Sequence, residues 1–400
     1  MIAAMHPLRV LVVATKSPWP PVDGGRLVLL NTIEGLAEAG HSVVLVAPWS
    51  GASDQRRRAE TALAPMCDPH LVAATPRTRH VSAMLGLLTA TPMSVVRHTL
   101  PEVQRRVAEI IEGGGVDVVH AEQLHALAQT APARAAGLPL VHRAHNVEAA
   151  LWAFAIRHRG PIARSAVARE ARLMTAWEAD ALASATATVT LTEADRRALS
   201  DLVPEASVHA VPAPFAAELP ACAADLDGDP VVTTFASTTW KPSRDAVERF
   251  VRGTWPEVRR RLPTAVLHVF GGGRHLASVD GIVPHAPPAD SRDAFPAGAV
   301  AVVPARHPTG VPMKVLEAWA RGLPVVADPS TAAALGATDG VELLVAGGAD
   351  AYADALGRLH DEDTLRPALV AAARRALADR HDPASVTEHL VRVYRWAIER

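Results

Sequence analysis

The sequence predicts an α/β protein of two similar domains, each an open parallel sheet covered by helices. Short apolar runs alternate with amphipathic segments along the 400 residues, which is the rhythm of strand–helix–strand units. The alternation restarts near the middle of the chain, beyond a proline-containing connector. Hydrophobic residues make up 49% and charged residues 20%, a composition that can fill globular cores. Two such domains joined by a hinge predict a ligand cleft at the carboxyl ends of the strands.

Apolar runs of about four to eight residues predict the buried strands, and longer runs with helical spacing predict the helices. In the first half the predicted strands are 10–14, 42–47, 116–120, 138–143, 186–191 and 207–211, and the predicted helices are 26–39, 100–112 and 163–183. In the second half the predicted strands are 231–236, 265–270, 299–304, 323–327 and 341–345. The predicted helices there are 243–261, 313–321, 349–359, 364–378 and 385–399.

The domain boundary is predicted at about residue 215. Pro212 and Pro214 stiffen the connector, and an Ala/Asp-rich stretch follows them. The predicted domains are therefore 1–215 and 216–384. The last helix, within 385–400, carries large apolar residues and packs either back on the first domain or on its own.

Composition excludes several classes of protein. A formal net charge of -2 gives no sign of nucleic-acid binding. Cys67 and Cys222 stand far apart with no CxxC or Cys/His cluster, which favours a reducing compartment over a disulfide framework or a zinc site. No apolar run reaches the length of about 18 residues that a transmembrane helix needs. We therefore expect a cytoplasmic protein, either free or at the inner face of the membrane.

A locally basic segment of the first domain has two interpretations. Arg56–Arg58, Arg77, Arg79 and His80 precede the apolar run Met84–Leu88. Such a segment suits peripheral contact with an anionic membrane or with an acidic acceptor. The alternative, which we favour from sequence, is a solvated helix face followed by a core segment.

The most informative motif runs from 309 to 326 and predicts a glycine loop, a helix and a buried strand. Gly310 permits a tight turn and a close ligand. Pro312 suits a first helical turn, whose free N–H groups form an anion site beside the charge of Lys314. Glu317, one turn further along, is placed to accept hydrogen bonds from a ribose diol. The motif predicts a nucleotide held by its diphosphate and sugar, with an ordinary strand–helix crossover as the alternative.

Glycines follow two other predicted strands. Gly24 and Gly25 open the helix after the first strand, where they permit close approach by a substrate or phosphate. They do not complete a GxGxxG fingerprint, so NAD binding is not favoured. Gly271 and Gly272 follow 265–270 and permit a flat base to lie on the backbone, with a simple flexible loop as the alternative.

Polar side chains also follow predicted strands. His145 comes after 138–143, where an imidazole can bind a sugar hydroxyl or transfer a proton. Lys241 and Arg244 stand near a helix N-terminus and suit a diphosphate, and Arg306 can pair with a phosphate through two hydrogen bonds. A structural role is the alternative for each.

Together these segments resemble family 4 of the retaining glycosyltransferases, whose GT-B architecture has two Rossmann-like doubly wound domains facing across a cleft. The resemblance covers nearly the whole chain, with landmarks in the right order at 17–26, 143–148, 240–245 and 310–326. The last segment is the most specific, because it is similar to the KxLEAxAxGxPVV run of the family's donor site.

The resemblance implies a role for each candidate residue. His145 and Glu317 would be catalytic, and Glu317 would also bind the nucleoside with Gly271 and Gly272. The implied donor and phosphate-binding residues are Gly24, Gly25, Lys241, Arg244, Arg306, Thr309, Gly310, Val311, Met313 and Lys314.

The resemblance also implies the reaction: sugar transfer to an acceptor hydroxyl by front-face substitution, with retention, no metal and no cofactor. The co-substrate would be a UDP sugar, with GDP and dTDP sugars as alternatives. The acceptor would be a glycan, a lipid or a natural product.

Two positions depart from the family pattern. Many members carry a glutamate where this chain has Thr309, and a neutral hydroxyl there predicts a different or deoxygenated donor sugar. Ser237 stands where an arginine is expected, so the phosphate contacts of Lys241 and Arg244 are carried over less directly. Competing interpretations are a sugar-nucleotide epimerase of the same architecture and a non-catalytic nucleotide-sugar-binding relative. An NAD enzyme is more distant, since its fingerprint is incomplete.

Overall fold

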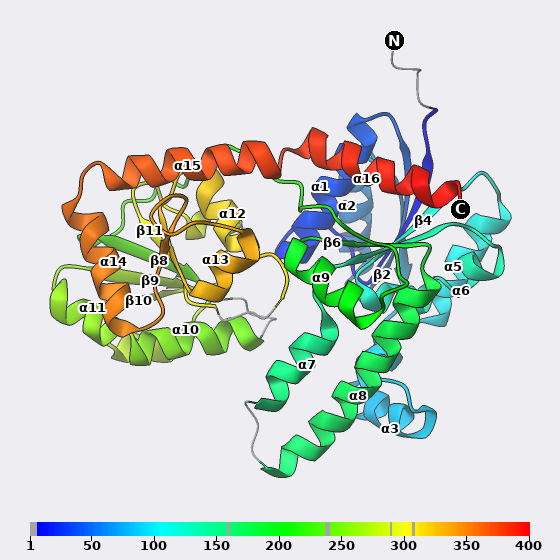
Figure 1. The fold of residues 1–400 in the computed structure, drawn as a ribbon, viewed down its shortest axis with the longest axis horizontal. Coiled ribbons are helices and arrows are strands. Elements are labelled where there is room, and N and C mark those ends of the chain that lie inside the picture. Colours follow the sequence, from blue (N-terminus) through cyan, green and yellow to red (C-terminus); the bar gives the residue numbers. More distant parts are fainter. Residues whose placement is uncertain (1–5, 158–160, 237–240, 289, 306–308) are drawn as a thin grey trace.

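The chain folds into two α/β domains, and its last helix returns to the first of them (Figure 1). The computed structural model describes residues 6–157, 161–236, 241–288, 290–305 and 309–400. Each domain has a parallel sheet with helices on its faces, so the prediction of two doubly wound domains is confirmed.

Within the described residues, the first domain has a seven-stranded sheet with the order β3-β2-β1-β4-β5-β6-β7. All of its strands run parallel, and Val10 of the central strand pairs with Val43 on one side and Val118 on the other. The strands are β1 (Arg9–Ala14), β2 (Ser42–Trp49), β3 (Asp68–Ala73), β4 (Val118–Glu122), β5 (Leu140–Ala144), β6 (Ala187–Thr190) and β7 (Val208–Ala210).

Helices connect these strands and cover the sheet. They are α1 (Gly24–Glu38), α2 (Ser53–Leu63), α3 (Arg79–Thr89), α4 (Met93–His98), α5 (Pro101–Glu112), α6 (Ala131–Ala135), α7 (Glu148–Arg157), α8 (Pro161–Ser184) and α9 (Glu193–Leu202), with the 3-10 helix η1 (Leu124–Gln129). Two of them, α7 and α8, project below the domain with α3 beside α8 (Figure 1).

The second domain repeats the strand order of the first. Its described sheet has six parallel strands in the order β10-β9-β8-β11-β12-β13. They are β8 (Val231–Phe235), β9 (Val266–Phe270), β10 (Ile282–His285), β11 (Val300–Val303), β12 (Val325–Ala327) and β13 (Leu344–Val345). The helices are α10 (Lys241–Gly253), α11 (Trp255–Arg261), α12 (Met313–Ala320), α13 (Pro329–Leu335), α14 (Ala349–Asp361) and α15 (Leu365–Arg380), with the 3-10 helices η2 (Arg274–Ser278) and η3 (Ser291–Ala294).

The structure corrects the predicted elements in three respects. Strands β3 and β10 were not predicted, because both are short edge strands interrupted by polar or proline residues. The predicted helix 243–261 is two helices, broken at Thr254 ahead of Pro256. Several helices of the first domain, among them α3, α7 and α9, were also missed.

The C-terminal helix α16 (Pro383–Ile398) packs on the first domain, and α15 packs on the second (Figure 1). Val386, Leu390 and Tyr394 of α16 are buried with Val10 and Val12 of β1 in one core cluster. Between the two helices, His381 accepts at its carbonyl from the N–H of Phe215, and its ring contacts the carbonyl of Ala213 at 2.8 Å. The two chain crossings between the domains therefore lie together. No helix among the described residues is long and apolar enough to span a bilayer.

Candidate active site

Four segments meet where the two domains adjoin. Three of them follow the carboxyl ends of β1, β4 and β5 in the first domain, and the fourth is the loop that precedes α12 in the second. The parallel order of each sheet accounts for this, because polar side chains beyond adjacent parallel strands reach the same edge. The described residues form no cluster of three or more metal-ligating side chains.

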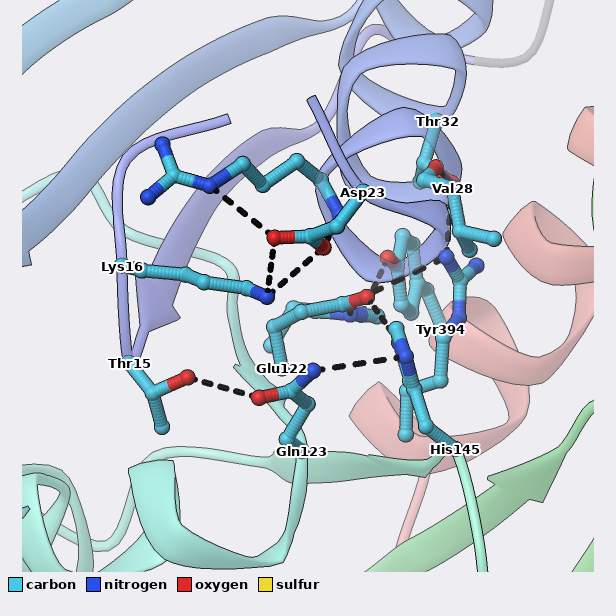
Figure 2. Close-up of polar contacts among 12 residues, drawn as sticks. Thr15, Lys16, Asp23, Val28, Thr32, Glu122, Gln123, His145 and Tyr394 are labelled. Carbon is cyan, nitrogen blue, oxygen red and sulfur yellow. Dashed lines mark hydrogen bonds and ion pairs between the residues drawn. The ribbon is translucent and has the colours of Figure 1, made fainter. Parts of the chain in front are cut away.

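His145, beyond β5, is held in one orientation by two side chains of the β4 edge (Figure 2). Its Nε2 lies 2.5 Å from Oε1 of Glu122, and its Nδ1 lies 3.5 Å from the amide nitrogen of Gln123. A carboxylate only accepts hydrogen bonds, so Nε2 carries the proton and the lone pair of Nδ1 faces the Gln123 amide. The Nδ1 side also faces Gly25, where an added Cβ would lie 3.5 Å away. The structure thus brings together Gly25 and His145, two residues that the sequence analysis named separately.

Glu122 is the centre of a buried polar network that ends on the C-terminal helix (Figure 2). Its other oxygen contacts Nε2 of His120 at 2.6 Å, and Nδ1 of His120 bonds the hydroxyl of Tyr394 at 2.7 Å. The guanidinium of Arg143 lies 3.8 Å away and is fully buried. Burial opposes the charge of Glu122, but the Arg143 guanidinium and the hydrogen bonds from His120 and His145 outweigh it and hold the pKa of this carboxyl well below its ordinary value.

The segment after β1 is tied by a second carboxylate. Asp23 caps α1 by accepting from the N–H of Arg26 at 3.0 Å, and it also accepts from Nζ of Lys16 at 2.7 and 2.8 Å (Figure 2). Burial opposes the charge of Asp23, and the Lys16 ammonium overcomes it, so the pKa is lowered. These contacts place Gly24 and Gly25 at the start of the helix.

The loop before α12 is pressed against the first domain. Gly310 has φ of +85°, and a Cβ there would lie 2.4 Å from Oδ1 of Asn146 and 2.9 Å from the carbonyl of His145. A Cβ on Gly24 would likewise lie 2.8 Å from Cγ of Met313. Glycine is required at both places by close approach between domains, and at Gly310 by backbone conformation as well.

The first turn of α12 carries a partly buried lysine. Nζ of Lys314 donates to Oγ of Ser243 at 2.8 Å and to the carbonyl of Phe235, and it lies 4.8 Å from the centre of the Phe235 ring. Burial lowers the pKa of this amine to about 7, although Glu317 favours the charged form. Lys314 therefore connects the end of β8 with the first turns of α10 and α12.

Glu317 is buried and partly paired. Its Oε1 accepts from the guanidinium of Arg321 at 2.9 Å and from the hydroxyl of Ser291 at 2.5 Å. Among the described residues, nothing donates to its Oε2. That oxygen is the one available for a ligand hydroxyl.

The other predicted residues are placed as follows. Arg306 and Ser237 lie outside the described residues, and only the backbone of Lys241, at the start of α10, is described. Arg244 is half-buried in the first turn of α10, and Val311 packs against the core cluster around α12.

A Cβ on Gly271 would lie 2.3 Å from the carbonyl of Ala236, and one on Gly272 would lie 2.6 Å from Val269. Protein packing thus already requires both of these glycines.

Sequence reasoning missed Glu122, Gln123 and Asp195. The sequence signal for Glu122 is a His-Ala-Glu run at the end of a strand, with both polar residues on one face. Asp195 follows Thr192 by three residues, which indicates only a helix cap. Its carboxylate nevertheless accepts from the hydroxyl of Thr309 at 2.5 Å and from the N–H of Gly310 at 3.0 Å, across the domain junction.

The helix after His145 begins against an acidic side chain. Glu178 of α8 accepts from the N–H groups of Glu148 and Ala149 at 2.8 and 2.9 Å, and so caps α7. Burial raises the pKa of Glu178 to about 7, and burial together with the Glu178 carboxylate does the same for Glu148. The segment that carries His145 is thus held at His145 by Glu122 and at the start of α7 by Glu178.

Comparison with known proteins identifies both halves of the chain. The family model described as Glycosyltransferase Family 4 matches residues 22–219, and the model described as Glycosyl transferases group 1 matches residues 229–362. No curated protein sequence gives a significant match.

Solved structures resemble the fold over nearly its whole length. The Anabaena protein HepE in complex with UDP-glucose is 14% identical, with a TM-score of 0.66 and coverage of 96% of this chain and 99% of that one. Sucrose-phosphate synthase from Thermosynechococcus elongatus is 14% identical, with a TM-score of 0.72 and coverage of 98% and 99%. A glycosyltransferase from Rickettsia africae is 11% identical, with a TM-score of 0.64 and coverage of 99% and 100%. At these identities the likeness is one of fold.

Proposed function

Because the chain belongs to family 4 of the glycosyltransferases and has their GT-B fold, we propose that it transfers a sugar from a nucleoside diphosphate to an acceptor hydroxyl with retention of configuration. The observation that carries this proposal is the meeting of His145 with the loop that begins α12. One domain supplies a proton-handling side chain there, and the other supplies a helix N-terminus. No metal is assigned a role.

The diphosphate would lie at the N-terminus of α12. No side chain among the described residues caps this helix, and its N–H groups carry the positive end of the helix dipole. Lys314 brings an amine to the same turn, and Arg244 is in the first turn of α10, which Lys314 contacts through Ser243. Stabilising the charge that develops on the departing diphosphate is the main catalytic demand of this reaction.

His145 would act on the transferring sugar. Because Glu122 fixes the proton on Nε2, a sugar or acceptor hydroxyl that displaces the long 3.5 Å contact of Gln123 can donate a hydrogen bond to Nδ1. In retaining front-face substitution the acceptor proton goes to the departing phosphate as the new glycosidic bond forms. The acceptor would approach from the first domain, beside Gly24 and Gly25.

We propose UDP as the nucleotide, with Oε2 of Glu317 bonding its ribose. The fold of HepE, which was solved with UDP-glucose, supports this assignment. Calorimetric titration with UDP, GDP and dTDP tests it. We expect UDP to bind most tightly of the three. Glu317→Gln should weaken UDP binding by roughly tenfold or more, which is equivalent to about 1.4 kcal/mol. The exposed control Glu388→Gln should leave UDP affinity unchanged. Absence of binding by all three nucleotides, or equal affinity in Glu317→Gln, would contradict the proposal.

We also propose that α3 contacts an anionic membrane surface. Its residues Val81, Met84, Leu87 and Leu88 share one helical face and are 41%, 60%, 63% and 79% exposed. The structure therefore contradicts the interpretation of Met84–Leu88 as a core segment. Arg79 and His80 are exposed on the same helix, and no acidic residue occurs between 69 and 101. An apolar face with basic flanks and no acid suits an anionic lipid surface.

The other basic residues named from sequence do not join this surface. Arg77 donates to the carbonyls of Val96 and Thr99 at 3.0 and 2.6 Å and so fixes the neighbouring α4. Arg56–Arg58 belong to α2, which Figure 1 draws well away from α3. The proposed membrane contact is thus limited to α3.

Vesicle flotation tests the membrane proposal. We expect the protein to float with vesicles of phosphatidylcholine and phosphatidylglycerol and to remain unbound with phosphatidylcholine alone. Met84→Ser with Leu88→Ser should abolish flotation, while Val341→Ser, an exposed apolar control in the second domain at 47% exposure, should not. Equal flotation of the α3 variant, or none by the unmodified protein, would contradict it.

A further inference from the structure

One carboxylate of the first domain accepts hydrogen bonds from the loop that precedes α12 of the second domain. Asp195, in the first turn of α9, is 3% exposed. Its Oδ1 accepts from the hydroxyl of Thr309 at 2.5 Å, and its Oδ2 accepts from the N–H of Gly310 at 3.0 Å. Both oxygens are therefore satisfied by the opposite domain.

The hydroxyl of Thr309 extends this contact to the segment that carries His145. Its oxygen accepts from the N–H of Val147 at 2.7 Å, and a backbone N–H only donates, so the hydroxyl proton must point to Asp195. Thr309 is 7% exposed, which leaves its hydroxyl directed to protein groups on both sides. Gly310 then passes against Asn146 at a distance that excludes any side chain.

These contacts can exist only while the domains are close together. If the domains separate, the buried carboxylate of Asp195 loses its hydrogen bonds from Thr309 and Gly310. The hydroxyl of Thr309 then also loses its hydrogen bond from the N–H of Val147. Hydrogen bonds to a carboxylate are the strong ones, and the bond from Thr309 is short at 2.5 Å. The bonds also fix where α12 begins relative to His145.

We propose that Asp195, Thr309 and Gly310 form an interdomain latch, with Asp195 as a positioning residue that holds the start of α12 against the His145 segment. The effect of the latch on catalysis rests on the proposed function, which places the donor diphosphate at the N-terminus of α12. The latch selects the closed arrangement before the donor arrives. Without it, the apparent dissociation constant of the donor equals the intrinsic constant divided by the fraction of molecules that remain closed, so donor affinity falls as that fraction falls.

The kinetic signature follows from that relation. Asp195→Asn keeps the side-chain volume, but its amide nitrogen faces a hydrogen-bond donor. We expect the donor KM to rise by roughly tenfold or more while kcat at saturating donor changes by less than about threefold. A residue needed only for folding would lower the melting temperature and the active fraction without changing KM. Asp201→Asn, on the exposed end of the same helix, is the matched control.

A second pair of variants isolates the hydroxyl. Thr309→Ser keeps it and should retain the donor KM, whereas Thr309→Val has nearly the same volume and should raise KM as Asp195→Asn does. Combining Asp195→Asn with Thr309→Val should raise KM by less than the product of the two single effects, because both variants remove the Thr309–Asp195 hydrogen bond. Additive effects would overturn the latch.

Domain closure is measured independently of sugar transfer. Small-angle X-ray scattering of the ligand-free protein should give a larger radius of gyration for Asp195→Asn and Thr309→Val than for the unmodified protein and Asp201→Asn. If the variants open but no nucleotide sugar is consumed, the latch stands and the proposed function fails. If sugar is transferred and neither KM nor the radius of gyration changes in the variants, the latch is wrong and the proposed function stands.

Discussion

At the residue scale, the burial of the Lys314 amine predicts that donor binding depends on pH. Burial brings the pKa of its amine from the ordinary 10.5 to about 7, so above that pH the folded protein holds it neutral. A diphosphate favours the charged form, so donor binding takes up a proton above about pH 7. The same shift raises the free energy of unfolding from pH 7 towards 10.5, because there the unfolded chain binds the extra proton.

We therefore expect UDP affinity to fall as pH rises above about 7, approaching tenfold per pH unit at the limit of full linkage. Lys314→Met should bind UDP weakly at every pH and show a flat profile over that range. Calorimetric titration from pH 6 to pH 9 measures both. An equal slope in the two proteins would show that another group is responsible.

Glu122 gives a second residue-scale prediction. Its pKa is lowered well below the ordinary value of 4.5, so its contribution to stability is complete above that pH and is lost as pH falls through the folded pKa. Glu122→Gln leaves the buried Arg143 without its carboxylate and should lower the free energy of unfolding by about 3–5 kcal/mol. Urea unfolding at pH 7 and at pH 4 measures this. The loss should be smaller at pH 4, and an equal loss at both would contradict the assignment.

At the scale of elements, the loop before α12 shows why glycine is required. In Gly310→Ala, the φ of +85° and a Cβ placed 2.4 Å from Asn146 both force a shift of the loop. We expect a loss of roughly tenfold or more in kcat/KM, since a displacement of about 1 Å at such a site costs far more than that.

Gly357→Ala is the control for this substitution. Gly357 lies inside α14, where an added Cβ meets nothing within 4 Å. The alanine should leave activity unchanged and stabilise the helix by about 0.5–1 kcal/mol. Full activity in Gly310→Ala would show that the loop has room to move.

The sequence predicted α12 and its loop well because that signal is local. Gly310, Lys314, Glu317 and Gly322 carry the sequence signals for a turn, a proposed anion site and a helix end within 13 positions of one another. All strands of both sheets except the edge strands β3 and β10 were found, because buried parallel strands are continuous apolar runs. The edge strand β3 was not found, since it begins Asp-Pro-His and is only partly buried.

The partners of His145 and Thr309 could not be predicted, because they depend on folding. Glu122 is 23 positions from His145, and Asp195 is 114 positions from Thr309. Each of these carboxylates has a simple local interpretation, as a strand-end residue or a helix-cap neighbour. Only the packing of one domain on the other gives Asp195 its role.

At the scale of the whole molecule, two domains with the same strand order are joined at two neighbouring crossings. The connector near Phe215 and the break between α15 and α16 hold each other through His381. The loops that meet at the junction lie beyond the carboxyl ends of the strands. In the proposed function, the second domain would carry the donor site and the first would supply His145.

The most direct test of the account is proton NMR of a UDP sugar incubated with the protein and a panel of hydroxyl acceptors. We predict that the anomeric signal of the donor decays, that free UDP forms, and that the new glycosidic signal has the anomeric configuration of the donor. Conversion of the donor to another nucleotide sugar without free UDP would indicate an epimerase. Unchanged spectra with UDP, GDP and dTDP sugars would contradict the account.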